Sequence, residues 1–276
     1  MTVTGRINSR YIREKWYVGI LSQVYSLPNF MSNETIPTAQ THPDRTCVVE
    51  TASAEGPERR YTYKQIYEAS NTLAHYLHDA GITNDDVVMI FAHRSVDLVV
   101  AIMGTLSSAA TFTVLDPAYP PARQKIYLEV AQPRALINIG RATDEAGVLA
   151  PIVRSYIDDE LNLKTEVPSL RIGDDGTLSG GEIDGKDVFS DALRKASAPP
   201  PTQVGPDSNP TLSFTSGSEG RPKGVLGRHY SLCKYFAWMA ERFGLSSESK
   251  FTMLSGSKSF TYYTHLAFYV MVNIGH

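Results

Sequence analysis

The sequence VVMIFA at residues 87–92 gives the first indication of the fold. A short, uninterrupted apolar run is typical of a β-strand that is buried on both faces of a sheet. Ser95 follows this run and is placed to cap a helix that begins with the mostly apolar residues 96–103. We therefore expect a strand that passes directly into a helix packed on the same sheet.

The same alternation continues on both sides of this stretch. Residues 64–80 have apolar side chains at helical spacing, and Gly81 follows them as a helix stop. Downstream, TFTVL at residues 111–115 and ALINI at residues 135–139 are strand-like, with an expected helix at residues 122–132 between them. Alternating strands and helices predict an α/β fold with a mostly parallel sheet flanked by helices.

Composition excludes several classes of function. The 276 residues carry a net charge of −3 with acids and bases interspersed, so nucleic acid is not an expected partner. No run approaches the ~18 apolar residues of a membrane span, and the amino terminus lacks the apolar stretch of a signal peptide. Cys47 and Cys233 are expected to be reduced, without a disulfide partner, and the histidines show no metal-ligand spacing. These features favour a soluble, cytoplasmic protein with no protein-bound metal.

Two stretches of different character follow the alternating region. Residues 171–187 are rich in glycine and acids, and residues 198–210 read APPPTQVGPDSNP. Both are expected to be surface connections, the second stiffened by proline. A disordered interdomain linker is the alternative. We favour a bridge between two halves of one domain, because another strand-like segment follows at once.

The sequence TSGSEGRPKG at residues 215–224 is the most informative for function. It follows residues 212–214, the expected end of a buried strand, and precedes a predicted helix at residues 229–243 that Gly244 ends. A strand, a loop of small residues and a helix form an arrangement that holds polyphosphate, because backbone N–H groups converge on the anion and hydroxyls add donors.

Three interpretations of this loop compete. Glycine, serine and proline are common in simple surface turns. A Walker-type P-loop would need glycine at Pro222 and serine or threonine at Gly224, so that interpretation fails. The signature T-S-G-S/T-x-G-x-P-K-G of adenylate-forming enzymes matches at every fixed position, and we favour it.

These residues resemble the adenylate-forming superfamily of acyl-CoA ligases, luciferases and peptide-synthetase adenylation domains. Within it, the chain resembles the fungal α-aminoadipate reductases. Two further stretches carry this resemblance, YTYKQI at residues 61–66 and LDPAYPPARQ at residues 115–124, and the likeness around the loop runs on to residue 232. Glu219 also stands where the wider superfamily usually has threonine and these reductases have glutamate.

The resemblance implies the first part of the large amino-terminal subdomain of an adenylating enzyme. Such a domain uses ATP and Mg²⁺ to activate the carboxylate of L-2-aminoadipate and releases pyrophosphate. In the full-length reductases, a phosphopantetheine thiol then takes the acyl group, and a separate domain reduces it with NADPH, in lysine biosynthesis.

The matching positions imply a set of nucleotide-binding residues but no complete catalytic set. These residues are Thr215, Ser216, Gly217, Ser218, Glu219, Gly220 and Lys223. The Glu219 carboxylate would repel phosphate unless Mg²⁺ or Arg221 offsets its charge. The alternative, that its side chain turns to solvent, stays open.

The resemblance also divides the chain into three segments. Residues 1–36 are unplaced, residues 37–256 are a partial AMP-binding domain, and residues 257–276 diverge from the reductases. The last segment has no acidic residue, which favours a translated intron over the alternative of an amphipathic helix packed on the core. Because a purine pocket and a carboxy-terminal lysine have no counterpart here, the chain alone is expected to be inactive.

Two other functions remain open at this point. One is a different carboxylate-activating enzyme, either an acyl-CoA ligase or a peptide-synthetase adenylation domain. The other is a truncated nucleotide-binding protein without catalysis. The carboxylate substrate, the oligomeric state and the stability of the chain alone do not follow from the sequence.

Overall fold

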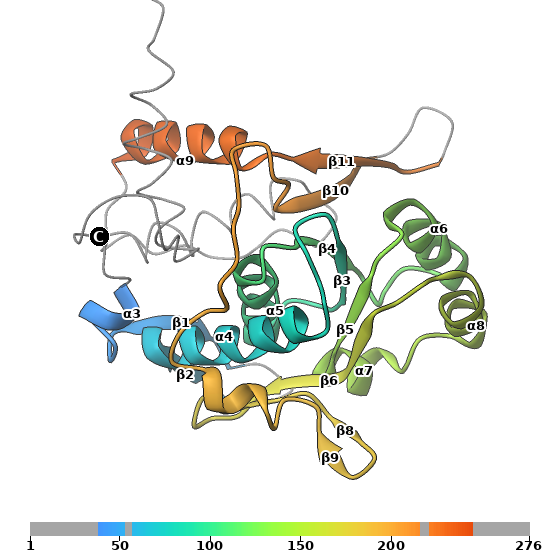
Figure 1. Ribbon diagram of the computed structural model, residues 1–276, viewed down its shortest axis with the longest axis horizontal. Coiled ribbons are helices and arrows are strands. Elements are labelled where there is room, and N and C mark those ends of the chain that lie inside the picture. Colours follow the sequence, from blue (N-terminus) through green and yellow to red (C-terminus); the bar gives the residue numbers. More distant parts are fainter. Residues whose placement is uncertain (1–37, 53–56, 216–220, 245–276) are drawn as a thin grey trace, which may run out of the picture.

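The computed structural model describes residues 38–52, 57–215 and 221–244 of the chain (Figure 1). Within these residues, a seven-stranded sheet has the strand order β11-β10-β4-β3-β5-β6-β7. Its strands are β3 (Val87–Phe91), β4 (Thr111–Leu115), β5 (Ala135–Ile139), β6 (Thr165–Ile172), β7 (Leu178–Ser179), β10 (Thr211–Thr215) and β11 (Lys223–Gly227). The strands from β10 to β6 are parallel, whereas β11 and β7 are antiparallel to their neighbours. The predicted α/β fold is confirmed.

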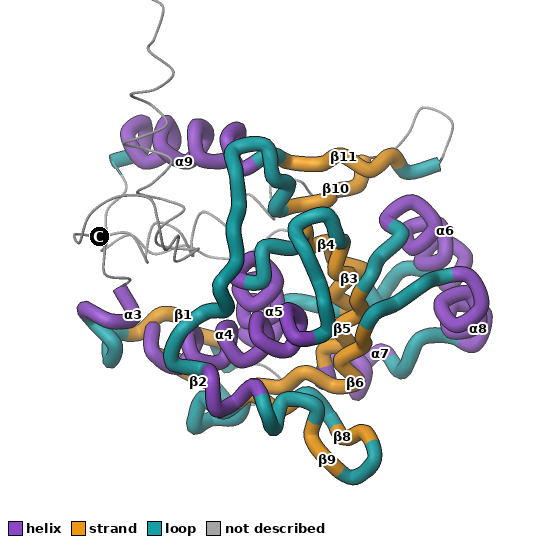
Figure 2. Tube along the Cα trace, viewed as in Figure 1, coloured by secondary structure: helices purple, strands orange, loops and turns teal. Residues whose placement is uncertain are grey.

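Helices cover both faces of the sheet (Figure 2). Helices α4 (Tyr63–Asp79) and α5 (Val96–Ser107) contribute to the core on one face. Helices α6 (Pro121–Ala131) and α8 (Pro151–Glu160) contribute to the core on the other face. The remaining elements are α3 (Thr38–Thr41), β1 (Thr46–Glu50), β2 (Arg59–Thr62), α7 (Gly140–Ala146), β8 (Glu182–Ile183), β9 (Lys186–Asp187), the 3₁₀ helix η2 (Ala192–Lys195) and α9 (His229–Phe243).

Local hydrogen bonds explain where the helices on the first face begin. The Thr62 hydroxyl accepts a bond from the Gln65 N–H at 3.2 Å, and the Gln65 side chain accepts one from the Thr62 N–H at 2.9 Å. This reciprocal capping box fixes the start of α4. The Ser95 hydroxyl accepts from the Leu98 N–H at 3.2 Å, so the predicted cap of α5 is confirmed.

Helices α4 and α5 approach each other at Gly104 more closely than a side chain there would allow. A Cβ atom at this glycine would lie 2.7 Å from Leu73 Cδ2 and 2.8 Å from Leu73 Cβ and Cγ. Leu73 is fully buried in the same core. The absence of a side chain at Gly104 therefore sets the distance between the two helices.

The strongly patterned elements agree with the sequence predictions. The strands at residues 111–115 and 135–139 and the helix at residues 229–243 have the predicted bounds, and the predicted helices at residues 64–80 and 122–132 are each displaced by one residue. The β1–β2 hairpin, β6, α7 and α8 were not predicted. In β6, buried positions are interrupted by half-exposed ones and by Pro168, so no continuous apolar run marks the strand.

The expectation of a plain surface connection at residues 171–187 is wrong. These residues complete β6, add β7 to the sheet and form the separate β8–β9 hairpin. Gly176, Gly181 and Gly185 have φ angles of +88°, +90° and +77°, so each supplies a tight turn in the left-handed region. The glycines that suggested a loop lie in the turns between short strands.

The proline-rich residues 198–210 lie against the domain. The His75 ring nitrogen Nε2 is 2.9 Å from the carbonyl oxygen of Ala198, and the Thr202 hydroxyl donates to the carbonyl of Ser107 at 3.1 Å. The Phe112 N–H in β4 donates to the Pro210 carbonyl at 2.9 Å. These contacts with α4, α5 and β4 support the bridge between two halves of one domain.

Two further observations concern the part of the chain that the structure describes. None of its helices combines the length and the apolarity needed to cross a bilayer. The Cys47 thiol is buried, and burial raises its pKa to about 12. Cys47 thus packs as a small apolar side chain, as expected, whereas the side chain of Cys233 lies outside the described residues.

Candidate phosphate-binding site

The loop signature lies at the turn of a β-hairpin. Strands β10 and β11 pair antiparallel, and Thr215 is the cross-strand partner of Lys223. Both residues are exposed. The structure therefore brings together the first predicted site residue and the last. Ser216, Gly217, Ser218, Glu219 and Gly220 lie outside the described residues, so their predicted role stays a prediction.

One part of the expected arrangement is wrong. The loop is followed by β11 and not directly by the helix, which starts only at His229. Because β11 runs back along β10, the start of α9 is roughly 16 Å from the loop, at the opposite edge of the sheet. The helix dipole of α9 therefore does not act at the loop. The strand escaped prediction because its five residues include Gly224 and Gly227 and are largely exposed.

The sheet topology places the hairpin turn at the edge where ligands bind in folds of this class. Strand β10 is parallel to its neighbour β4, so Thr215 lies at the carboxyl edge of the sheet. The connection after β3 leads to α5 on one face, and the connection after β4 leads to α6 on the other. In open α/β sheets, ligands bind at the carboxyl edge where connections change face in this way.

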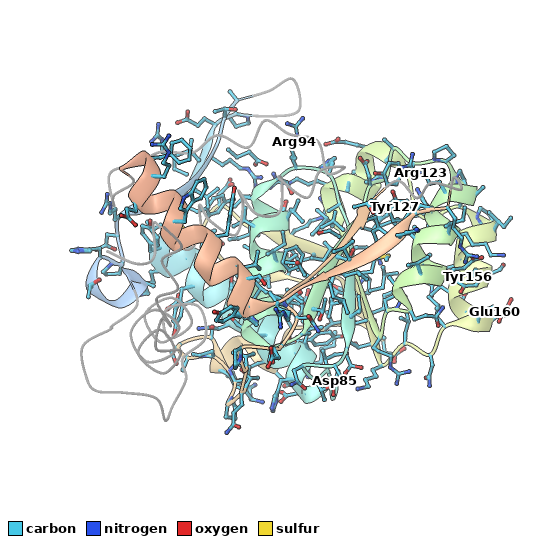
Figure 3. All side chains as sticks on the ribbon, turned by 90° about the horizontal axis from the view of Figure 1, so that it is seen from above. Asp85, Arg94, Arg123, Tyr127, Tyr156 and Glu160 are labelled. Atoms are coloured by element: carbon cyan, nitrogen blue, oxygen red, sulfur yellow. The ribbon has the colours of Figure 1, made fainter. Side chains whose placement is uncertain are left out.

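Helix α6 packs against the hairpin next to its turn. The rings of Tyr127 and Phe214 meet edge to face, with centroids 4.2 Å apart. The Arg123 guanidinium lies 4.4 Å from the ring centroid of Tyr119 and donates to the Tyr127 hydroxyl at 3.1 Å. Figure 3 shows Arg123 and Tyr127 beside the two hairpin strands. On the far side of the turn, Arg221 Nη2 lies 3.0 Å from Glu129 Oε2 of α6.

Other polar groups follow the carboxyl ends of the central strands. His93 Nε2, just after β3, lies 2.9 Å from Glu145 Oε2 of α7. The Asp116 carboxylate, just after β4, accepts a hydrogen bond from the Ala118 N–H at 2.9 Å and shapes the chain leading to α6. Among the described residues, no group of three or more His, Cys, Asp or Glu side chains is arranged to hold a metal ion.

A buried carboxylate near the same edge was missed by the sequence analysis. Asp97 of α5 is fully buried, and its Oδ1 accepts a hydrogen bond from the Ile172 N–H of β6 at 2.7 Å. Its Oδ2 lies 3.5 Å from Arg141 Nε, and the Arg141 guanidinium also pairs with Glu50 of β1 at 3.0 Å. This network joins α5, α7, β1 and β6, and in the sheet β4, β3 and β5 separate β6 from β10.

Asp97 should make the stability of the domain depend on pH. Burial raises its pKa from 3.8 to about 6, although the Ile172 N–H opposes the shift. Between about pH 4 and pH 6 the folded state therefore binds this proton more tightly than the unfolded state, so the contribution to stability falls as pH rises. Wild type is expected to lose about 2 kcal/mol more than Asp97→Asn between pH 4 and pH 7. Urea unfolding of both proteins at several pH values measures this difference, and parallel pH profiles would contradict it.

Comparison with protein families shows which family the chain belongs to. The family model described as AMP-binding enzyme matches residues 37–276, which is most of the chain. The chain belongs to the AMP-binding enzyme family. The residues of the β10–β11 hairpin lie inside this match, as does the parallel sheet.

Several curated proteins are similar to the chain. It is 60% identical over 218 residues to the L-2-aminoadipate reductase large subunit of Penicillium chrysogenum, with 79% of this chain and 16% of that protein covered. It is 54% identical over 222 residues to the L-2-aminoadipate reductase of Schizosaccharomyces pombe, with 79% and 15% covered. The chain thus spans about one sixth of the length of these relatives.

Solved structures share the fold of this chain. VinN has a TM-score of 0.63 at 17% identity, covering 86% of this chain and 53% of its own. A fatty acyl-adenylate ligase from L. pneumophila, in complex with acyl adenylate and pyrophosphate, has a TM-score of 0.62 at 18% identity, covering 86% and 37%. MatB from Rhodopseudomonas palustris with ATP bound has a TM-score of 0.58 at 18% identity, covering 86% and 43%.

Proposed function

We propose that the chain is the first part of the adenylation domain of an L-2-aminoadipate reductase. This domain would use ATP to activate the carboxylate of 2-aminoadipate before thioester formation and reduction. The observation that carries the proposal is the hairpin that pairs Thr215 with Lys223 at the carboxyl edge of the sheet. The chain is 54–60% identical to proteins named L-2-aminoadipate reductase, and this identity supports the choice of substrate.

The proposed reaction depends on positive charge and hydrogen-bond donors at the site. A carboxylate attacks the α-phosphorus of ATP, and the bond to pyrophosphate breaks as negative charge builds on the departing oxygens. Lys223 and the hydroxyl of Thr215 would bind these oxygens from the two sides of the hairpin turn. Ser216, Gly217, Ser218, Glu219 and Gly220 are proposed to add backbone and side-chain donors, with the role of Glu219 still open.

Other groups used by the full-length reductases are proposed to act outside these residues. The described residues provide no cluster for Mg²⁺, so no side chain here is assigned to the metal. Phosphopantetheine and NADPH would act on domains beyond the matched region. Participation in lysine biosynthesis and a cytoplasmic location are further parts of the proposal.

A chimera tests the proposed function. In the Penicillium chrysogenum reductase, the 218 matching residues would be replaced by those of this chain. The chimera is expected to catalyse ATP–pyrophosphate exchange that depends on 2-aminoadipate. The 276-residue chain alone, which covers 16% of that relative, is expected to bind pyrophosphate weakly and to catalyse no exchange.

The outcomes of this experiment separate the alternatives. Exchange that depends on a different carboxylate, and not on 2-aminoadipate, would indicate another carboxylate-activating ligase. A folded chimera without exchange for any carboxylate would contradict adenylation by this segment. Exchange by the chain alone would contradict its proposed inactivity.

The division into segments is also part of the proposal. Residues 1–36 stay unassigned, residues 37–256 form the partial adenylation domain, and residues 257–276 are proposed to be a translated intron. The family model matches through residue 276 and so includes the proposed intron residues, which is a reason to test the intron on the gene itself. A nucleotide sequence without an intron donor at codons 257–259 would contradict the intron.

A further inference from the structure

Arg221 lies within the hairpin turn and is held by a side chain of another element. Its Nη2 atom is 3.0 Å from Glu129 Oε2 of α6, and the two side chains are 65% and 30% exposed. Ion pairs this exposed are weak, because solvent screens them and both side chains lose freedom. The pair can therefore separate at little cost.

Apolar contacts hold the hairpin independently of this pair. Tyr127 of α6 packs against Phe214 at the end of β10. On β11, a Cβ atom at Gly224 would lie 3.3 Å from Val130 of α6 and 3.0 Å from Leu212, so the strand backbone lies directly against the helix. Arg221 can thus leave Glu129 without displacing the hairpin strands.

The position of Arg221 brings it within reach of an anion at the turn. It is two residues from Lys223, a span of at most roughly 7 Å along the chain. A guanidinium binds phosphate oxygens with two parallel hydrogen bonds, and it does so more strongly than it binds one exposed carboxylate oxygen. Glu129 meanwhile places a negative charge beside the turn, where it opposes an incoming triphosphate.

We propose that Arg221 is a further phosphate-binding residue of this site, and that Glu129 holds it until a polyphosphate displaces the carboxylate. The inference rests on the proposed function, because it assigns polyphosphate to the hairpin turn. It adds a competition between Glu129 and the ligand for one guanidinium. Glu129 therefore weakens polyphosphate binding and Arg221 strengthens it.

The two side chains should change ligand affinity in opposite directions. Inorganic pyrophosphate and ATP are the probes, titrated into the 276-residue chain and its variants at low salt. Arg221→Gln is expected to weaken binding about tenfold and to reduce its salt dependence. Glu129→Gln is expected to strengthen binding about threefold, since it removes an exposed pair and a nearby negative charge. In the Arg221→Gln background, most of the gain from Glu129→Gln should disappear.

Arg228 provides a matched control. It follows β11 at the opposite end of the hairpin, and its Nη1 lies 3.2 Å from Asp207 Oδ1 in a pair whose side chains are 56% and 81% exposed. Arg228→Gln makes the same charge change, and it should leave pyrophosphate binding unchanged. Circular dichroism of every variant shows whether the fold is retained.

Each outcome decides the inference. Weaker binding by Glu129→Gln would mean that the ion pair positions the turn, and it would overturn the competition. Equal loss of pyrophosphate affinity in Arg221→Gln and Arg228→Gln would mean that only net charge matters, and it would also overturn the inference. An unmodified chain that binds no pyrophosphate would overturn the inference as well. The proposed function is tested separately by aminoadipate-dependent exchange in the chimera, because pyrophosphate binding does not depend on 2-aminoadipate. In the active chimera, the same variants should change the KM for ATP more than kcat.

Discussion

Replacing Lys223 with alanine is expected to lower aminoadipate-dependent ATP–pyrophosphate exchange by the chimeric reductase about 10²–10³-fold. Lys223 begins β11 opposite Thr215, at the hairpin turn where pyrophosphate is proposed to leave. Removing one preorganised group that stabilises charge in a transition state commonly has an effect of about this size. The loss should appear mainly in kcat, because the charge that Lys223 opposes develops during bond breaking.

A lysine away from the hairpin serves as the control for this substitution. Lys186 lies on β9, and its Nζ is 2.9 Å from Asp191 Oδ2. Lys186→Ala removes the same charge without touching the β10–β11 hairpin, so it should leave exchange unchanged. Full activity of the Lys223→Ala chimera would show that pyrophosphate is bound elsewhere, and equal losses in both variants would indicate a general charge effect.

Shortening Leu73 to alanine is expected to lower the free energy of unfolding by about 3–4 kcal/mol. Leu73 is fully buried between α4 and α5, and the lost apolar contacts add to the effect of the cavity that remains. The opposite change at the same contact, Gly104→Ala, is expected to destabilise by about 1–3 kcal/mol, because the new methyl group overlaps Leu73. Urea unfolding followed by circular dichroism measures both values.

The double variant Leu73→Ala/Gly104→Ala tests whether these effects share one contact. Two of the three atoms that a methyl group at Gly104 would meet, Leu73 Cγ and Cδ2, are absent from alanine. The combined loss should therefore be smaller than the sum of the single losses. Gly205→Ala is the matched control for the glycine substitution, since its new Cβ would lie 4.0 Å from the nearest neighbouring side-chain atom, Ser208 Oγ. Strictly additive losses would contradict direct contact between the two sites.

The sequence predicted the elements whose burial is uniform. Residues 111–115 and 135–139 are buried along their whole length, so apolar side chains alone mark these strands. Strand β11 is different because its residues are mostly exposed and its glycines carry no side-chain pattern. Its formation depends on pairing with β10, which local propensity does not encode.

The candidate site was predicted in residue type but not in geometry. The signature identified Thr215 and Lys223, whereas their cross-strand pairing depends on the register of a hairpin that was not foreseen. The contact between Arg221 and Glu129 joins residues 92 positions apart, and that between Asp97 and Ile172 joins residues 75 apart. Partners at such separations arise from topology, which brings together segments that no local pattern relates.

The β8–β9 hairpin offers a practical use. Its turn contains Asp184 and Gly185, both with positive φ angles, and the neighbouring Ile183 is half exposed. Figure 1 shows this hairpin projecting away from β10 and β11. Exposed turns of this kind are the positions where inserted peptides are best tolerated. An epitope or a fluorophore-binding peptide placed between Asp184 and Gly185 would give a label remote from the hairpin that is proposed to bind phosphate.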